Sequence, residues 1–134
     1  MKYDKLLAWL VLLGSLFLLA LPRLIPTCTG VAANGSPMLC HYTYQAEFLV
    51  ALVATILAGA LFALKTSEAR LLAGFTLALL AVVLAVLPAA WASGICANGA
   101  CGKTAFFTVA GAGVVALAAA VLAWINYRRC REDR

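Results

Sequence analysis

Four long apolar stretches constrain the fold of this chain more strongly than any other feature. They cover residues 6–21, 48–64, 71–91 and 104–124. The hydrocarbon core of a bilayer is ~30 Å thick, and about 20 mostly apolar residues cross it as a helix. We therefore expect an all-α polytopic membrane protein in which four transmembrane helices pair into two hairpins and residues 1–134 form a single domain.

The composition of the chain supports a membrane protein and leaves almost nothing for a soluble domain. Of its 134 residues, 66% are hydrophobic and only 11% are charged, whereas soluble domains average roughly 45–50% and about 25%. The spans must therefore lie in the lipid bilayer and pack against one another or against a partner. As partners we expect other membrane subunits or a second copy of the chain. The net charge of +5 follows from membrane orientation, so it does not indicate a nucleic-acid partner.

The basic residues are divided unevenly between the two sides of the expected spans. The loops 22–47 and 92–103 hold two of them, Arg23 and Lys103. The termini and the loop 65–70 hold eight: Lys2, Lys5, Lys65, Arg70, Arg128, Arg129, Arg131 and Arg134. Because short cytoplasmic loops carry an excess of Lys and Arg, we predict a multi-pass protein of the inner or plasma membrane. Both termini are then cytoplasmic and both longer loops face outward.

Four of the five cysteines lie in the two outer loops, where each pair flanks an Ala-Asn-Gly segment. Cys28 and Cys40 flank the first, and Cys96 and Cys101 flank the second. Asn-Gly accepts the positive φ angles of tight turns, and cysteines normally pair in an oxidising compartment. We therefore predict one disulfide staple within each loop, while pairing between the loops would cross-link the two hairpins. The fifth, Cys130, is expected to be a free thiol on the cytoplasmic side.

The outer cysteine pairs also suggest a catalytic alternative. Four spans, cytoplasmic termini and two outer pairs resemble the bacterial disulfide-bond-forming membrane oxidoreductases and, more loosely, the vitamin K epoxide reductase family. That resemblance implies thiol–disulfide exchange coupled to a quinone, with redox roles for Cys28, Cys40, Cys96 and Cys101. Those families use Cys-x-x-Cys, which tunes thiolate reactivity, whereas here eleven and four residues intervene. We therefore favour structural staples and a chain that is not an enzyme.

A group of soft ligands precedes the second span. Met38, Cys40 and His41 offer a thioether, a thiolate and an imidazole, a set that suits copper. Cys40 is no thiolate ligand once it is paired with Cys28, and the spacing of Cys28, Cys40 and His41 is not the Cys-x-x-Cys-His of haem attachment. We therefore predict no copper, zinc or haem cofactor.

Ionisable, soft and aromatic side chains converge at the outer edge of the second span, where we place a candidate outer-face site: Met38, His41, Tyr42, Tyr44 and Glu47. A carboxylate entering a membrane helix indicates function, because burying it is costly. We expect Glu47 to stay in water in the first helical turn, near the positive end of the dipole. If the helix begins before His41, the imidazole and the carboxylate lie ~9 Å apart along the axis and on different faces. An extended start would bring them together.

The interiors of the spans are expected to be apolar. Without buried Asp, Glu, Lys or Arg they offer no proton or ion pathway. Small residues recur at packing intervals, which lets helices approach closely. These residues are Ala51, Ala54 and Ala58 in the second span, and Gly113, Ala116 and Ala120 in the fourth. They can seat the spans on one another or seat the bundle on a partner.

Residues 38–47 (MLCHYTYQAE), followed by a span, are similar to an uncharacterised family of small four-span prokaryotic membrane proteins. Its members carry a Cys-His pair before span two and paired cysteines before span four, and Cys40, His41 and Glu47 are the matching positions. Some members lie beside export-type ABC permeases, so the resemblance implies an accessory membrane subunit. From the sequence we predict a non-enzymatic accessory, assembly or scaffolding subunit of a larger membrane complex. The quinone-coupled thiol oxidoreductase is the alternative.

Overall fold

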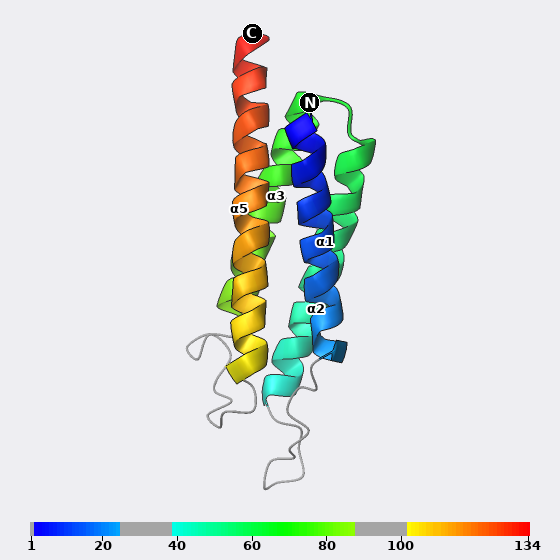
Figure 1. The fold of residues 1–134 in the computed structure, drawn as a ribbon, viewed down its shortest axis with the longest axis vertical. Coiled ribbons are helices and arrows are strands. Elements are labelled where there is room, and N and C mark those ends of the chain that lie inside the picture. The colour runs from blue at the N-terminus through cyan, green and yellow to red at the C-terminus, as the bar shows by residue number, and fades with distance from the viewer. Residues whose placement is uncertain (1, 25–38, 88–101) are drawn as a thin grey trace, which may run out of the picture.

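The computed structural model describes residues 2–24, 39–87 and 102–134, and in this part of the chain all regular structure is helical. The helices are α1 (Lys2–Leu24), α2 (Leu39–Ala63), α3 (Ser67–Val86) and α5 (Gly102–Glu132). Each is long and apolar enough to cross a membrane. The prediction of an all-α chain with four helices of transmembrane length is therefore confirmed (Figure 1).

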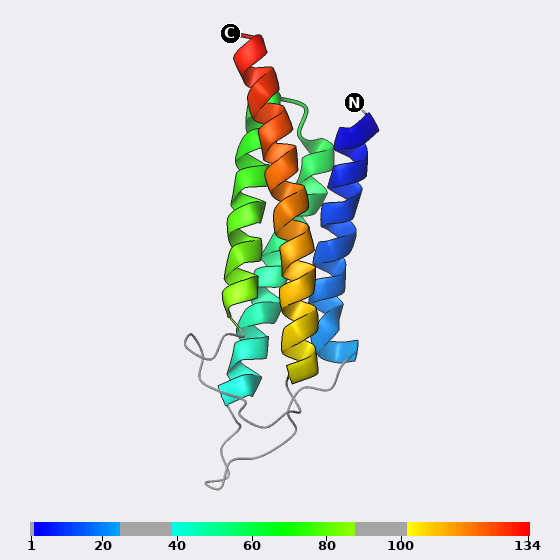
Figure 2. The same ribbon diagram turned by 60° about the vertical axis from the view of Figure 1, so that its left-hand side comes forward.

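The four helices form a ring in which neighbours run antiparallel. α1 packs on α2, α2 on α3 and α3 on α5, and α5 closes the ring by packing on α1. The N- and C-termini lie together at one end of the bundle, which we call the terminal end (Figures 1 and 2). At the other end, which we call the far end, α1 and α3 finish and α2 and α5 start. The helix order therefore matches two hairpins.

The helices extend beyond the predicted spans, most of all in α2 and α5. α2 begins at Leu39 rather than at 48, and α5 continues to Glu132 rather than ending at 124. The predicted outer loop 22–47 is therefore too long, because residues 39–47 are helical. That segment contains no Gly or Pro, so its polar side chains interrupt the hydropathy pattern without interrupting the helix.

Glycines set the closest helix contacts inside the bundle. A Cβ added at Gly14 of α1 would lie 2.5 Å from Val115 Cγ2 of α5, and one at Gly111 would lie 3.0 Å from Leu18 Cδ2. A Cβ added at Gly74 of α3 would lie 3.4 Å from a backbone oxygen of α5. Such small-residue contacts replace the aqueous driving force that helices lack in lipid. α5 is therefore the helix against which both α1 and α3 are tightly fitted.

The two stripes of small residues identified in the sequence have different fates. Ala51, Ala54 and Ala58 of α2 are all buried in the core, so this stripe packs the spans on each other. On α5 the stripe is divided, because Ala116 packs against the core, whereas nothing lies within 4 Å of a Cβ added at Gly113 and Ala120 is exposed. Gly113 and Ala120 therefore do not serve the interior of the bundle, whereas Ala116 does.

Candidate functional site

A buried carboxyl group bridges the bundle near its far end. Glu47 of α2 is 0% exposed, and the Thr108 hydroxyl of α5 donates a hydrogen bond to Glu47 Oε1 at 2.9 Å. Thr108 is also 0% exposed. Among the described residues, the second oxygen, Glu47 Oε2, is buried without a hydrogen-bond partner. This pair, which we call the far-end pair, links α2 to α5 across the ring.

The expectation that Glu47 stays in water is therefore wrong. It assumed that the residue occupies the first turn of its helix, whereas α2 begins at Leu39. Eight residues of helix before Glu47 amount to a rise of about 12 Å, so the carboxyl group lies well inside the bundle and not at its mouth. An acid buried beside one hydroxyl and an unpartnered oxygen carries a substantial desolvation penalty. Glu47 is accordingly the strongest functional candidate among the predicted site residues that the structure describes.

The structure describes less of the surroundings of the other predicted site residues. α2 begins before His41, so the extended start that would bring the imidazole to Glu47 does not occur. Glu47 follows His41 by six helical positions, so the two positions are offset by ~9 Å along the axis and lie on different faces. The early turns of α2 also contain Cys40, Tyr42 and Tyr44. The remaining members lie outside the described residues: Cys28, Met38, Cys96 and Cys101.

A second buried carboxyl group lies at the terminal end. Asp4 of α1 is 5% exposed, and the Arg129 guanidinium of α5 forms an ion pair and a hydrogen bond with its Oδ2. Asp4 Oδ1 is buried without a hydrogen-bond partner in the described structure. Next to this pair along α5, Asn126 is 1% exposed, and its Nδ2 donates to the backbone oxygen of Leu122 at 2.8 Å. We call Asp4 and Arg129 the terminal-end pair.

Sequence reasoning missed the burial of both acids, Asp4 and Glu47, for the same reason. The expected apolar spans began after Asp4 and after Glu47, and the last ended before Arg129, so these polar groups were assigned to water. The helices in fact continue, and α1 and α5 remain packed there. One signal was available: Asp4 is an acid within the basic N-terminal segment, and Arg129 lies in the basic C-terminal cluster at the same end of the bundle. The prediction of span interiors without buried acids is corrected accordingly.

Metal ligation finds no support among the described residues, which contain no group of three or more His, Cys, Asp or Glu side chains placed to hold an ion. Cys130 is a free thiol there, as expected. It donates a hydrogen bond to Ser67 Oγ at 3.3 Å and so connects α5 to the start of α3. The contact between Cys130 and Ser67 therefore joins two helices at the terminal end.

Comparison with known proteins places the chain in a family. Residues 10–125 match the family described as "Domain of unknown function (DUF4418)", and the chain belongs to this family. The match includes both Glu47 and Thr108 but ends before Asn126 and Arg129. No curated protein and no solved structure matches the chain.

Proposed function

We propose that this member of the family is a non-enzymatic accessory or assembly subunit of a larger membrane complex, with an export-type transporter as the first partner to test. The supporting observation is the outer face of α5 around Gly113. Gly113 and the α2 residue Gly59 each have nothing within 4 Å of an added Cβ. A glycine inside a helix costs about 0.5–1 kcal/mol relative to alanine. Inside the bundle, Gly14, Gly74 and Gly111 offset that cost by close packing, whereas Gly59 and Gly113 have no such contact.

Surfaces of small residues are what membrane helices use to pack against other helices. Along α5, Gly113 is flanked on the outer face by Ala110, Leu117 and Ala120, all exposed in the isolated bundle. A partner helix can bring its backbone close to this face, whereas lipid chains pack against it less closely. The proposal therefore assigns the α5 outer face to a partner subunit, or to a second copy of the chain.

We also propose the orientation that the basic residues indicate. Both termini share one end of the bundle, and this end carries the basic clusters of the sequence. By the positive-inside rule this end faces the cytoplasm, whether the chain lies in a plasma membrane or in an inner membrane. The far end then faces an oxidising compartment, and one disulfide within each loop, joining Cys28 to Cys40 and Cys96 to Cys101, remains the proposed pairing.

The partner proposal is tested by purifying the tagged protein from native membranes and identifying what co-purifies in stoichiometric amounts. The variant Gly113→Leu should lose the partner while the bundle keeps its thermal stability, because a Cβ added at this position has nothing within 4 Å. Ala63→Leu is the matched control, since it enlarges an exposed position on α2 instead. Recovery of the protein without any membrane partner, or unchanged recovery with Gly113→Leu, contradicts the assignment. A homodimer lost in Gly113→Leu identifies the partner as a second copy.

A second candidate is the quinone-coupled thiol oxidoreductase, and the far-end pair is the observation that favours it. Glu47 Oε2 is a buried polar atom without a partner in the described structure, and Cys40 lies in the same helix, seven residues before Glu47. In that reaction a dithiol becomes a disulfide while a quinone takes up two electrons and two protons to become a quinol. Adding a quinone to the reduced protein and following quinol formation tests it. Glu47→Gln should then slow the reaction, and the absence of quinol formation removes this candidate.

A further inference from the structure

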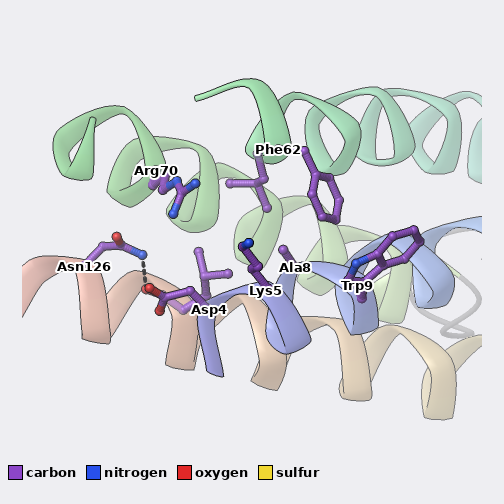
Figure 3. Close-up of a pocket in the computed structure, with 9 residues that line it drawn as sticks. Asp4, Lys5, Ala8, Trp9, Phe62, Arg70 and Asn126 are labelled. Atoms are coloured by element: carbon purple, nitrogen blue, oxygen red, sulfur yellow. Dashed lines mark hydrogen bonds between the residues drawn. The ribbon is translucent and has the colours of Figure 1, made fainter. Parts of the chain in front are cut away.

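A pocket of about 280 Å³ lies at the terminal end, where all four described helices contribute to its lining (Figure 3). Its polar side is formed by Asp4 and Lys5 of α1, Arg70 of α3 and Asn126 of α5. Its apolar side includes Trp9 of α1 and Phe62 of α2. This volume is at the lower limit of ligand pockets, which range over about 300–1,000 Å³. The pocket therefore suits a small polar group and not a whole lipid or peptide.

The charge of the pocket is positive. Asp4 is neutralised by its ion pair with Arg129, which leaves Lys5 and Arg70 as the uncompensated charges of the lining. Figure 3 shows both side chains pointing toward the same space from different helices. Because two positively charged side chains converge beside an acid that is already neutralised, the pocket favours an anionic ligand.

Arg70 is held in position for such an anion. Its Nε donates a hydrogen bond to the backbone oxygen of Leu64 at 2.7 Å, and this bond anchors the guanidinium to the connection between α2 and α3. The two terminal nitrogens of the guanidinium form no hydrogen bond or ion pair with the described residues. An anchored guanidinium with free terminal donors is the geometry that binds phosphate in a bidentate manner.

The apolar side of the pocket opens toward the outer surface of the bundle. The rings of Trp9 and Phe62 meet edge to face, with centroids 5.2 Å apart, and are 54% and 42% exposed. In a membrane-spanning bundle, exposed side chains of α1 and α2 face the lipid wherever they lie away from the helix ends. A ligand whose head enters the polar side therefore has its remainder beside these two rings.

We propose that this pocket binds the phosphate of an anionic phospholipid from the leaflet at the terminal end. Lys5 and Arg70 contact the phosphate, and the acyl chains leave the pocket along Trp9 and Phe62. Basic pockets between transmembrane helices on the cytoplasmic side bind anionic headgroups in this way. The site is independent of the partner face on α5, because its lining does not include Gly113 or Ala120.

The test is native mass spectrometry of the purified full chain, mixed with equal amounts of phosphatidylglycerol and phosphatidylcholine. The wild-type protein should retain phosphatidylglycerol preferentially. Lys5→Gln and Arg70→Gln should each lower the ratio of bound phosphatidylglycerol to phosphatidylcholine about fivefold, which corresponds to about 1 kcal/mol per basic residue. Lys65→Gln is the matched control: it removes the same charge from an exposed residue at the same end that does not line the pocket.

Each other outcome overturns the proposal. An equal loss with Lys65→Gln means that binding follows net charge and not the pocket. Equal retention of both lipids by the wild-type protein excludes headgroup selection. Displacement of phosphatidylglycerol by an equimolar amount of soluble glycerol 1-phosphate identifies a free phosphate compound, not a lipid, as the occupant. Lys5→Gln alone decides the outcome if Arg70→Gln does not fold, because Lys5 is exposed and makes no bond that holds the helices together.

Discussion

The far-end pair and the terminal-end pair both hold a buried carboxyl group, but with partners of different chemistry. Each buries a carboxyl group against α5, and each leaves one carboxyl oxygen without a partner in the described structure. At the terminal end the partner of Asp4 is a guanidinium, whose side chain is 37% exposed. At the far end the partner of Glu47 is a neutral hydroxyl that is fully buried. The first acid has a partly exposed counter-charge, whereas the second has only a neutral and fully buried partner.

This difference separates a stabilising contact from a functional candidate. An ion pair at the rim of a bundle joins two helix ends, and its charges are partly hydrated. A fully buried acid with one neutral donor is not explained by stability, since an apolar residue of similar size avoids the desolvation penalty. We therefore interpret the terminal-end pair as a clasp between α1 and α5, and Glu47 as a residue kept for a partner or ligand.

The largest expected effect concerns the membrane sides that the two ends face, because the proposed orientation puts them in different compartments. In a Cys130→Ser background, Arg23→Cys at the far end should react with an impermeant thiol reagent added to intact cells. Glu68→Cys at the terminal end should react only after the cells are opened. Both positions are exposed in the bundle, so burial does not affect the comparison. Labelling of Glu68→Cys in intact cells would reverse the orientation.

The next effect tests the clasp. Arg129→Gln leaves the Asp4 carboxylate buried without its counter-charge. Removing one partner of a buried ion pair costs about 3–5 kcal/mol, and because Arg129 is partly exposed we expect about 2 kcal/mol. The measurement is the free energy of unfolding in mixed detergent micelles. The second substitution Asp4→Asn should restore most of the stability, and a double variant as unstable as Arg129→Gln would show that no such coupling exists.

A smaller loss of stability is expected at the far end. Thr108→Val keeps the size of the side chain but removes the hydroxyl, so Glu47 Oε1 loses its hydrogen bond and becomes, like Oε2, a buried oxygen without a partner in the described structure. We expect a cost of about 1–2 kcal/mol, the penalty for a buried acceptor without its donor. Thr76→Val is the matched control, because the Thr76 hydroxyl bonds only to the backbone oxygen of Leu72 in its own helix. Equal losses in both variants would mean that the far-end pair adds nothing specific.

The comparison also shows what the sequence could and could not predict. Apolar length alone predicted the four helices of transmembrane length that the described residues form, because a helix is the structure that satisfies its backbone in lipid without help from neighbours. Hydropathy placed the ends of α2 and α5 wrongly, since residues 39–47 and 125–132 are polar but helical. The position of Glu47 in the candidate site was predicted, but its burial was not. Its donor, Thr108, lies 61 residues away, and no local pattern links the two.

The smallest expected change in stability gives the sharpest test of function. In Glu47→Gln the amide oxygen still accepts the Thr108 hydrogen bond, and the amide nitrogen replaces the unpartnered Oε2. His41→Ala alters a position on another face of α2, about 9 Å away along the axis. We expect both variants to insert and to unfold within about 0.5 kcal/mol of the wild-type protein, as is usual away from disrupted contacts. Both should nevertheless impair complementation of a deletion strain, Glu47→Gln more than His41→Ala. Full complementation by both would remove the far end as a functional site and leave packing as the role of the bundle, because neither substitution disturbs the helix contacts that hold it together.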